Sequence, residues 1–282
     1  MITIKRISNS LASRSKTYAS VWQTYKKIYF KKYKNLGSPE VYIWIFGCQR
    51  SGTTLLERIF RSDLSSAVFG EFSKLTINSS STVLKSLPEI DKELSSCNAR
   101  YAVVRPLFES DRAVEILQTF PKSKAIWLFR DFSLVVSSML NKWGDQFFEI
   151  SRKNETDKHG YWRMESMLDE INEESGACSS IEDKYALYWV KRNAIFFNND
   201  LHNNSQIVCL NYEQLVMKPE YCIDTFMKRS GESGIWNGFK TDAHVRSLKK
   251  SVKMNIAPEI VDRCNLMYSR LTKCSRQFFP DM

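Results

Sequence analysis

Residues 41–60 read VYIWIFGCQRSGTTLLERIF, and this stretch predicts a buried strand, a tight loop and a helix in succession. The strand prediction rests on the short apolar, β-branched and aromatic run that ends at Gly47. The helix prediction rests on four apolar residues at spacings of one, three and four, Leu55, Leu56, Ile59 and Phe60. A loop of glycines and hydroxyls at a helix N-terminus suits an anion, because its backbone N–H groups and the helix dipole both favour negative charge.

The spacing Gly47-x-x-x-x-Gly52 is that of a phosphate-binding loop, but the residues around it differ from those of a nucleotide triphosphatase. Such an enzyme places Lys directly after the second Gly, where it reaches the β- and γ-phosphates. Here Thr53 and Thr54 follow Gly52, and the cation stands earlier, at Arg50. Arg offers a rigid fork of donors for phosphate or sulfate oxygens. We therefore expect an oxyanion site; the alternative is an ordinary strand–turn–helix with a surface Arg.

The string G-x-x-R-S-G-T-T-L-L resembles the 5′-phosphosulfate loop of sulfotransferases, in the form of the tyrosylprotein enzymes and bacterial relatives. The cytosolic small-molecule enzymes usually carry Lys where this chain has Arg50. The resemblance implies transfer of a sulfuryl group from 3′-phosphoadenosine 5′-phosphosulfate to an acceptor hydroxyl, which leaves 3′,5′-adenosine diphosphate and requires no metal. It also implies donor contacts from the whole loop, Arg50, Ser51, Gly52, Thr53 and Thr54.

The length of 282 residues suits one large domain with an appendage, which we place at 40–282 and 1–39. Residues 1–39 contain nine Lys and Arg and no acid, so most of the net charge of +10 belongs to them. No run approaches a membrane-spanning helix or a signal peptide. Seven scattered Cys without metal spacing are typical of reduced thiols, and we expect a cytoplasmic protein.

The basic segment 16–34 predicts a helix, since Tyr and Trp recur on one face at positions 18, 22, 25, 29 and 33. Such a helix can lie on an anionic membrane or an acidic partner. The alternative, which we slightly favour, is that the aromatic face packs on the domain while the lysines are solvated. We expect no nucleic-acid partner.

Strands and helices alternate through the rest of the chain, which predicts an α/β three-layer sandwich with a central parallel, P-loop-like sheet. Further strands are expected at 66–69, 101–104, 124–129 and 206–210. Helices are expected at 79–96 with a break at Pro88, at 111–120, from 132 to about 143, at 181–200 and after Pro219. We interpret 144–180 as a solvated surface insertion, and the part from Gly231 onward as loop-rich and basic. Ligands bind such sheets at the carboxyl ends of strands, where four residues fall, Gly47, Gly70, Arg105 and Arg130.

A second motif, Arg130-Asp-Phe132 with Ser138 eight residues after the Arg, resembles the 3′-phosphate element of sulfotransferases, although Phe132 replaces the usual Pro. It implies that Arg130 and Ser138 hold the 3′-phosphate, with Lys142 as a weaker candidate. A third match, N-Y-E-Q-L-V-M-K-P from 211 to 219, places Tyr212 near the nucleotide. The resemblance covers roughly residues 41–230 in four blocks.

Acceptor activation needs a base, and the leaving oxygen needs positive charge. The three His, at 159, 202 and 244, do not fall at predicted strand ends, whereas Glu71 does, at the position where the tyrosylprotein-like enzymes place a catalytic Glu. Arg105 stands where those enzymes carry Lys, and Arg50 lies at the transferred group. The alternatives left open are a P-loop kinase or NTPase, with Asp131 as its metal carboxylate, and a membrane or nucleic-acid module led by residues 1–39. The class of the hydroxyl-bearing acceptor is not readable, because variable loops form its pocket.

Overall fold

The computed structural model describes residues 24–26, 28, 38–77, 81–150, 165–176, 180–229 and 254–280. Its centre is a five-stranded sheet in the order β2-β3-β1-β4-β5, and every neighbouring pair is parallel. The strands are β1 (Val41–Gly47), β2 (Ser66–Phe69), β3 (Tyr101–Val104), β4 (Ser123–Phe129) and β5 (Ile207–Asn211). The predicted strands and the predicted fold class are confirmed.

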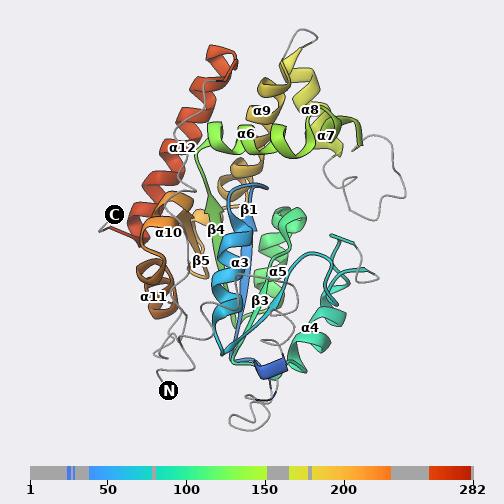
Figure 1. Ribbon diagram of the computed structural model, residues 1–282, viewed down its shortest axis with the longest axis vertical. Helices are drawn as coiled ribbons and strands as arrows, with labels where there is room; N and C mark the ends of the chain where they lie inside the picture. The colour runs from blue at the N-terminus through green and yellow to red at the C-terminus, as the bar shows by residue number, and fades with distance from the viewer. Residues whose placement is uncertain are drawn as a thin grey trace.

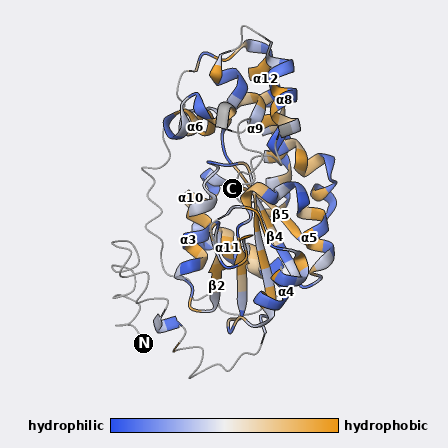
Figure 2. Ribbon diagram, turned by 90° about the vertical axis from the view of Figure 1, so that its right-hand side faces the viewer, coloured by the Kyte–Doolittle hydropathy of each residue, from blue (hydrophilic) through white to orange (hydrophobic). Residues whose placement is uncertain are grey.

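The alternation of side chains along β1 divides the core into two layers. Tyr42, Trp44 and Phe46 belong to one buried cluster, whereas Val41, Ile43 and Ile45 belong to the other. Successive side chains of a strand point to opposite faces, so both faces of this sheet must be covered by apolar helices. Figure 2 shows largely hydrophobic strands among helices along which hydrophobic and hydrophilic residues alternate.

Helices cover both faces of the sheet (Figure 1). One face packs against α4 (Leu87–Ser95), α5 (Ala113–Thr119), α6 (Phe132–Trp143), α9 (Ile181–Asn198) and α12 (Pro258–Phe278). The other face packs against α3 (Thr53–Ser62), α10 (Tyr212–Met217) and α11 (Pro219–Arg229). Two short 3₁₀ helices, η2 (Leu107–Arg112) and η4 (Leu201–Asn203), complete the connections on the described chain.

The order of the strands reverses at β1. The chain leaves β1 toward β2 and β3 on one side, then crosses to β4 and β5 on the other. In open parallel sheets this switch is where ligands bind, beyond the carboxyl ends of the strands. The register aligns Gly47 at the end of β1 with Leu128 near the end of β4. The loop after β1 and the residues after β4 therefore emerge at the same edge.

The helix predicted at 79–96 is wrong in its first half. Residues 81–86 are not helical, and Leu84 instead forms an isolated antiparallel bridge with Thr76. Helix α4 begins at Leu87, with Ser86 as its N-cap in a capping box with Glu89. Pro88 occupies the first turn of this helix, where its missing N–H costs nothing, so it starts the helix instead of breaking it.

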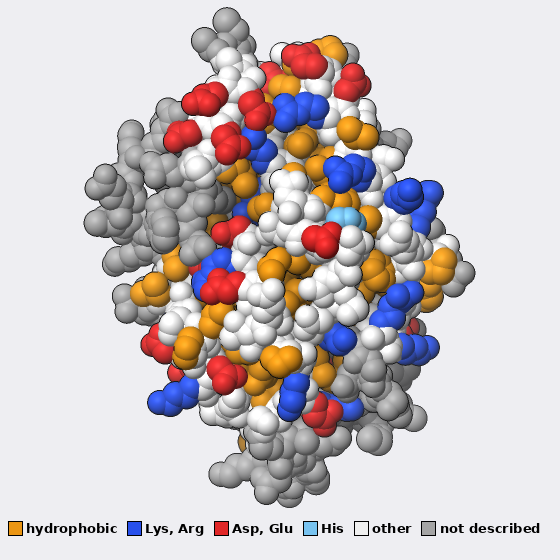
Figure 3. Space-filling view, turned by 180° about the vertical axis from the view of Figure 1, so that it is seen from behind, with side chains coloured by type: hydrophobic (Ala, Val, Ile, Leu, Met, Phe, Trp, Pro, Cys, Tyr) orange, Lys and Arg blue, Asp and Glu red, His pale blue; other side chains and the backbone are white. Residues whose placement is uncertain are grey.

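The interpretation of 144–180 as a solvated insertion is also wrong for its described parts. Helix α7 (Gln146–Ile150) buries Phe147 and Phe148, and α8 (Glu165–Ser175) buries Leu168 and Ile171 in the main core. The described acidic side chains of α8 are exposed, and Lys191 and Arg263 pair with one of them, Glu174. Figure 3 shows these acids gathered with basic side chains at one end of the molecule.

The C-terminal part contains a long helix that the loop-rich prediction missed. Helix α12 is 21 residues long and packs on α9 and β5. Its Tyr268 hydroxyl accepts a hydrogen bond from Asn211 Nδ2 at 3.2 Å, and its ring meets Phe129 edge-on at 5.8 Å between centroids. Helix α12 therefore supports the last residues of both β4 and β5.

Most of the predicted basic helix at 16–34, and most of the segment 1–39, lie outside the described residues. Lys26, however, is described and is buried, not solvated, with Nζ donating to the carbonyl of Ser66 at 3.0 Å. Ser66 begins β2, an edge strand of the sheet, so this Lys anchors its short segment there. Among the described helices, none is both long and apolar enough to cross a bilayer.

Candidate active site

The loop between β1 and α3 turns sharply because three of its residues adopt positive φ. Gly47 has φ 138°, Arg50 has φ 66° and Gly52 has φ 93°. A β-carbon on Gly47 would lie 2.2 Å from the carbonyl oxygen of Leu128, so only Gly lets β1 pass this close to β4. Arg50 holds a left-handed conformation that a non-Gly residue adopts at a cost, a feature common at ligand sites.

The N-terminus of α3 has the features of an anion site. Its N-cap is Gly52, and no side chain caps it, so its first N–H groups lack intrahelical partners. Ser51 is fully buried, and its Oγ has no hydrogen-bond partner among the described residues. Thr53 is buried and Thr54 is exposed at the same end. A phosphate or sulfate here would receive hydrogen bonds from groups that otherwise lack them.

Arg50 reaches from this loop to α6. Its Nε donates to Ser138 Oγ at 3.0 Å, and its guanidinium lies 6.0 Å from the ring centroid of Trp143. Partial burial and the nearby Arg130 both lower the pKa of Arg50. Two guanidinium groups therefore face one region. Ser138 accepts from Arg50, which leaves its own hydroxyl proton free for another acceptor.

Arg130 follows β4 and stacks on Tyr212, the residue after β5. Its guanidinium carbon lies 4.4 Å from the Tyr212 ring centroid, and its Nε is 3.9 Å from Glu213 Oε1. The Tyr212 ring also covers Gly52, where a β-carbon would lie 2.1 Å from Cδ2. One aromatic ring thus joins the β1 loop to Arg130, and the three motifs singled out in the sequence meet.

The N-terminus of α6 differs from that of α3, because a side chain occupies it. Asp131 is the N-cap and accepts hydrogen bonds from the backbone N–H groups of Ser133 and Leu134. An anion near α6 would therefore be held by side chains, Arg130 and Ser138, and not by the helix end. Lys142 lies one turn after Ser138 with an exposed side chain.

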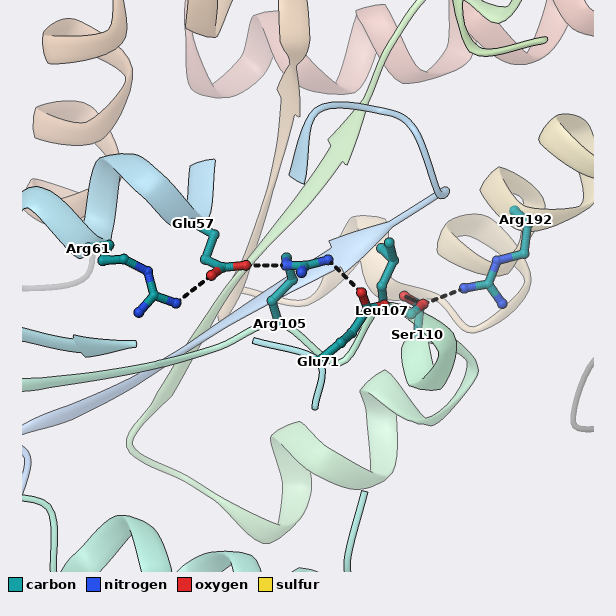
Figure 4. A network of polar contacts seen from close by, with 7 residues as sticks. All are labelled: Glu57, Arg61, Glu71, Arg105, Leu107, Ser110 and Arg192. Atoms are coloured by element: carbon teal, nitrogen blue, oxygen red, sulfur yellow. Dashed lines mark hydrogen bonds and ion pairs between the residues drawn. The ribbon is translucent and has the colours of Figure 1, made fainter. Parts of the chain in front are cut away.

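A chain of charged side chains lies beside the loop (Figure 4). Arg105, which follows β3, donates from Nε to Glu57 Oε2 at 2.6 Å and from Nη1 to Glu71 Oε2 at 3.2 Å. Glu57 lies on α3, and its other oxygen accepts from Arg61 at 2.5 Å. The order of contacts is therefore Arg61, Glu57, Arg105, Glu71. The predicted pair Arg105 and Glu71 do lie together, in an ion pair that also holds Glu57.

The two carboxylates of this chain titrate differently. Burial raises the pKa of Glu71; Arg105 opposes that effect, and the negative charge of Glu57 adds to it. Burial also acts to raise the pKa of Glu57, but Arg105 and Arg61 together outweigh it, so this pKa is lowered. Glu71 Oε1 is buried and has no hydrogen-bond partner among the described residues. Glu71 thus combines a raised pKa with one carboxylate oxygen that has no hydrogen-bond partner among the described residues.

Sequence reasoning missed Glu57, which appeared to be an ordinary helix residue beside an apolar stripe. It also missed Gln49, whose Oε1 accepts from the Tyr188 hydroxyl at 2.6 Å inside the core. Neither contact is local: Tyr188 and Arg105 are distant in sequence from their partners. His202, a described His, lies in η4 before β5 begins, at the opposite edge of the sheet from the loop.

The family model described as "Sulfotransferase domain" matches residues 41–235. No curated protein matches the sequence. Among solved structures, a sulfotransferase from Alicyclobacillus acidocaldarius is similar with a TM-score of 0.50 at 11% identity, over 86% of this chain and 96% of that one. The sulfotransferase domain from the curacin biosynthetic pathway has a TM-score of 0.45 at 15% identity, over 83% of this chain and 98% of that one. A mouse sulfotransferase complexed with PAP has a TM-score of 0.42 at 14% identity, over 86% and 89%.

The parallel sheet defines a P-loop-like α/β fold, and the uncapped start of α3 and two nearby arginines are donors that suit an anion. The family match spans more than half of the chain, and it adds the class of chemistry. The chain belongs to the sulfotransferase family, and it is a transferase by family and fold.

Proposed function

We propose that this protein transfers a sulfuryl group from 3′-phosphoadenosine 5′-phosphosulfate to an acceptor hydroxyl. The observation that carries the proposal is that the Tyr212 ring contacts both Arg130 and Gly52, so Arg130 lies beside the uncapped loop to which Arg50 belongs. Two nearby cations repel one another unless an anion lies between or beside them. A donor with a phosphosulfate at one end and a phosphate at the other supplies both anions.

The residues divide between the two ends of that donor. The N–H groups of Thr53 and Thr54, the hydroxyl of Ser51 and the guanidinium of Arg50 suit the phosphosulfate. Arg130 and the hydroxyl proton of Ser138 suit the 3′-phosphate, and Tyr212 lies between these two groups. The Tyr212 ring can lie there because Gly52 has no side chain. Lys142, one turn beyond Ser138, is a peripheral candidate for the same phosphate.

When bound, the donor supplies an activated sulfuryl group on a phosphosulfate anhydride. The residues of this chain have three tasks around it. Arg50 and the start of α3 stabilise negative charge on the leaving side. Glu71 accepts the proton of the acceptor hydroxyl, for which its raised pKa and its unpaired carboxylate oxygen suit it. Arg105 fixes the Glu71 carboxylate and adds positive charge on the acceptor side.

The kinase or NTPase alternative loses its candidate metal carboxylate. Asp131 accepts three hydrogen bonds within its own turn, from the N–H groups of Ser133 and Leu134 and from the Ser133 hydroxyl. Asp131 therefore acts as the N-cap of α6. The loop also carries Thr53 where a Walker lysine would stand. The module led by residues 1–39 stays a proposal about residues that mostly lie outside the described part of the chain.

Calorimetric titration with 3′,5′-adenosine diphosphate tests the proposal. We expect the wild type to bind it, and to bind 5′-adenosine monophosphate much more weakly, because the latter lacks the phosphate assigned to Arg130. Arg130→Ala should weaken binding of the diphosphate by roughly 10- to 100-fold, the effect of losing one or two charge-assisted hydrogen bonds. Failure of the wild type to bind, or an Arg130→Ala variant that binds like wild type, would overturn the proposal.

A further inference from the structure

The shorter of the two ion pairs of Arg105 is the one with Glu57, not the one with Glu71. Its Nε lies 2.6 Å from Glu57 Oε2, whereas its Nη1 lies 3.2 Å from Glu71 Oε2. Arg105 and Glu57 are equally protected, each with a side chain 11% exposed. An ion pair this short and this protected from water is far stronger than one on the surface.

The packing of Glu57 fixes where its carboxylate can lie. It points from the second turn of α3 toward the end of β2, under the backbone that leads into Glu71. A β-carbon on Gly70, the residue before Glu71, would lie 3.1 Å and 3.2 Å from the two Glu57 oxygens. Arg61 holds one of those oxygens from the next turn of the same helix. The Glu57 carboxylate therefore contacts Arg105, Arg61 and the backbone at Gly70, and these three contacts fix its position.

One guanidinium is thus divided between two carboxylates. The charged groups that face Glu71 in this network are Arg105 after β3 and Glu57 on α3, with Arg61 behind Glu57. If Glu57 were neutral, Arg105 would be free to turn both of its N–H groups on Glu71, in the bidentate geometry that Arg and carboxylates prefer. A carboxylate held in that way is a poor base, because its charged form is stabilised.

We propose that Glu57 is a positioning residue of the active site, which retains Arg105 so that Glu71 remains basic enough to deprotonate the acceptor hydroxyl. The role rests on the proposed function, in which Glu71 is the base. It explains why a carboxylate is buried on α3 next to a second carboxylate, an arrangement that is otherwise unfavourable. Arg61 keeps Glu57 ionised, since it offsets the cost of burial together with Arg105.

The test measures Glu71 directly, without knowledge of the acceptor. The protein is labelled with ¹³C at the Glu carboxyl carbons, and the Glu71 resonance is assigned by its loss in Glu71→Gln. Its titration is followed by NMR in wild type and in Glu57→Gln. We expect the midpoint to move to lower pH in Glu57→Gln, because a like charge is removed and Arg105 is released toward Glu71.

A matched control exists at the other end of the sheet. Glu40 pairs with Arg100 at 2.6 Å, and these residues directly precede β1 and β3, whereas the Glu57–Arg105 pair lies at the carboxyl ends. Glu40→Gln should leave the Glu71 titration where it is in wild type. Gln also has the shape of Glu, so Glu57→Gln leaves no cavity. Should it fail to fold, Glu57→Asp keeps the charge one methylene farther from Arg105 and should give a smaller shift in the same direction.

Turnover adds a second readout once a panel of phenols, tyrosine peptides and sugars has yielded an acceptor. Glu57→Gln should lower kcat and move the acidic limb of the rate profile to lower pH, with the KM for the donor unchanged. A purely structural Glu57 would lower the rate without moving the limb. An unmoved Glu71 midpoint in folded Glu57→Gln, or in Glu57→Asp, overturns this inference. Lack of donor binding by the wild type overturns the proposed function instead, and the NMR result stands independently of it.

Discussion

The ring of Tyr212 lies in the space that a side chain at residue 52 would occupy. An added β-carbon on Gly52 would lie 2.1 Å from Tyr212 Cδ2 and 2.3 Å from Cε2. The same ring stacks on the Arg130 guanidinium. The requirement for Gly at this position therefore comes from Tyr212, the residue after β5, as much as from the turn itself. One aromatic ring thus joins three motifs that are far apart in the sequence.

Gly52→Ala should therefore cost more than strain in the turn. A left-handed residue with a side chain costs about 1 kcal/mol, and displacement of Tyr212 would also release Arg130. We expect lower thermal stability and a loss of affinity for 3′,5′-adenosine diphosphate of roughly tenfold or more. Calorimetry and thermal unfolding measure the two effects.

Gly144→Ala provides the control for that variant. Gly144 ends α6 with φ 54°, and an added β-carbon meets nothing within 4 Å. It should show the backbone cost alone and bind the nucleotide like wild type. Equal nucleotide affinities for Gly52→Ala and Gly144→Ala would contradict the assigned role of the Tyr212 contact.

Ser138→Ala should weaken nucleotide binding by a modest factor. The variant loses the acceptor for Arg50 Nε and the donor assigned to the 3′-phosphate, which together are worth about 1 to 2 kcal/mol, or roughly 5- to 30-fold in affinity. Ser137→Ala, one position earlier on α6, is the control and should bind normally. Titration with adenosine 5′-phosphosulfate, which lacks the 3′-phosphate, should show a smaller difference between wild type and Ser138→Ala.

Glu71→Gln should separate binding from turnover. We expect loss of roughly 10²- to 10⁴-fold in kcat, the usual contribution of a general base, with nucleotide affinity near that of wild type. In wild type, the rate should rise with pH through a midpoint above the ordinary range of a Glu carboxyl, because burial raises the pKa of Glu71. If Glu71→Gln kept full turnover, Glu71 would not be the general base, and another residue would have to fill that role.

Lys26 should make stability depend on pH. Burial lowers its pKa from 10.5 to about 7, although Asp63 opposes the shift. Between these two values the unfolded chain binds more protons than the folded one, so stability should rise with pH across that window. Below about pH 7 both states are protonated, and the full cost of burying the charge is present.

Lys26→Met isolates this effect, since it keeps the length of the side chain and removes the titration. The difference in thermal midpoint between wild type and Lys26→Met, measured from pH 6 to pH 10, should therefore change in favour of wild type as the pH rises. A difference that stays constant over this range would show that Lys26 is solvated after all.

The parts of the fold that were predictable depend on local pattern. A few neighbouring residues are enough to recognise such a pattern. Examples are the apolar run of β1, the glycines of its loop and the Arg at the end of β4. Helix α12 had such a signal as well, because its buried residues follow a helical spacing, Ile260, Cys264, Met267 and Leu271. The many charges between them obscured it. The Pro88 error was also local: Pro favours the first turn of a helix as readily as it ends one.

The missed parts of the site depend on contacts between distant segments. Glu57 has no sequence signal that separates it from a solvated helix residue, because its burial depends on Gly70 and its charge on Arg105. Lys26 appeared equivalent to the other lysines of a basic segment until it was seen at the edge of β2. The resemblance to a family identified individual site residues. That Arg105 is shared between two carboxylates could be recognised only from the three-dimensional structure.

Helix α12 lies beyond residue 235, where the family match ends, yet Tyr268 contacts Phe129 and Asn211, the residues directly before Arg130 and Tyr212. The part of the chain that supports these residues is therefore longer than the segment matched by the family model. A truncation at the boundary of the family match would keep every motif residue. It would remove Tyr268, which packs behind the residues that precede Arg130 and Tyr212. The two positions that carry Arg130 and Tyr212 thus depend on a helix that none of the sequence motifs marks.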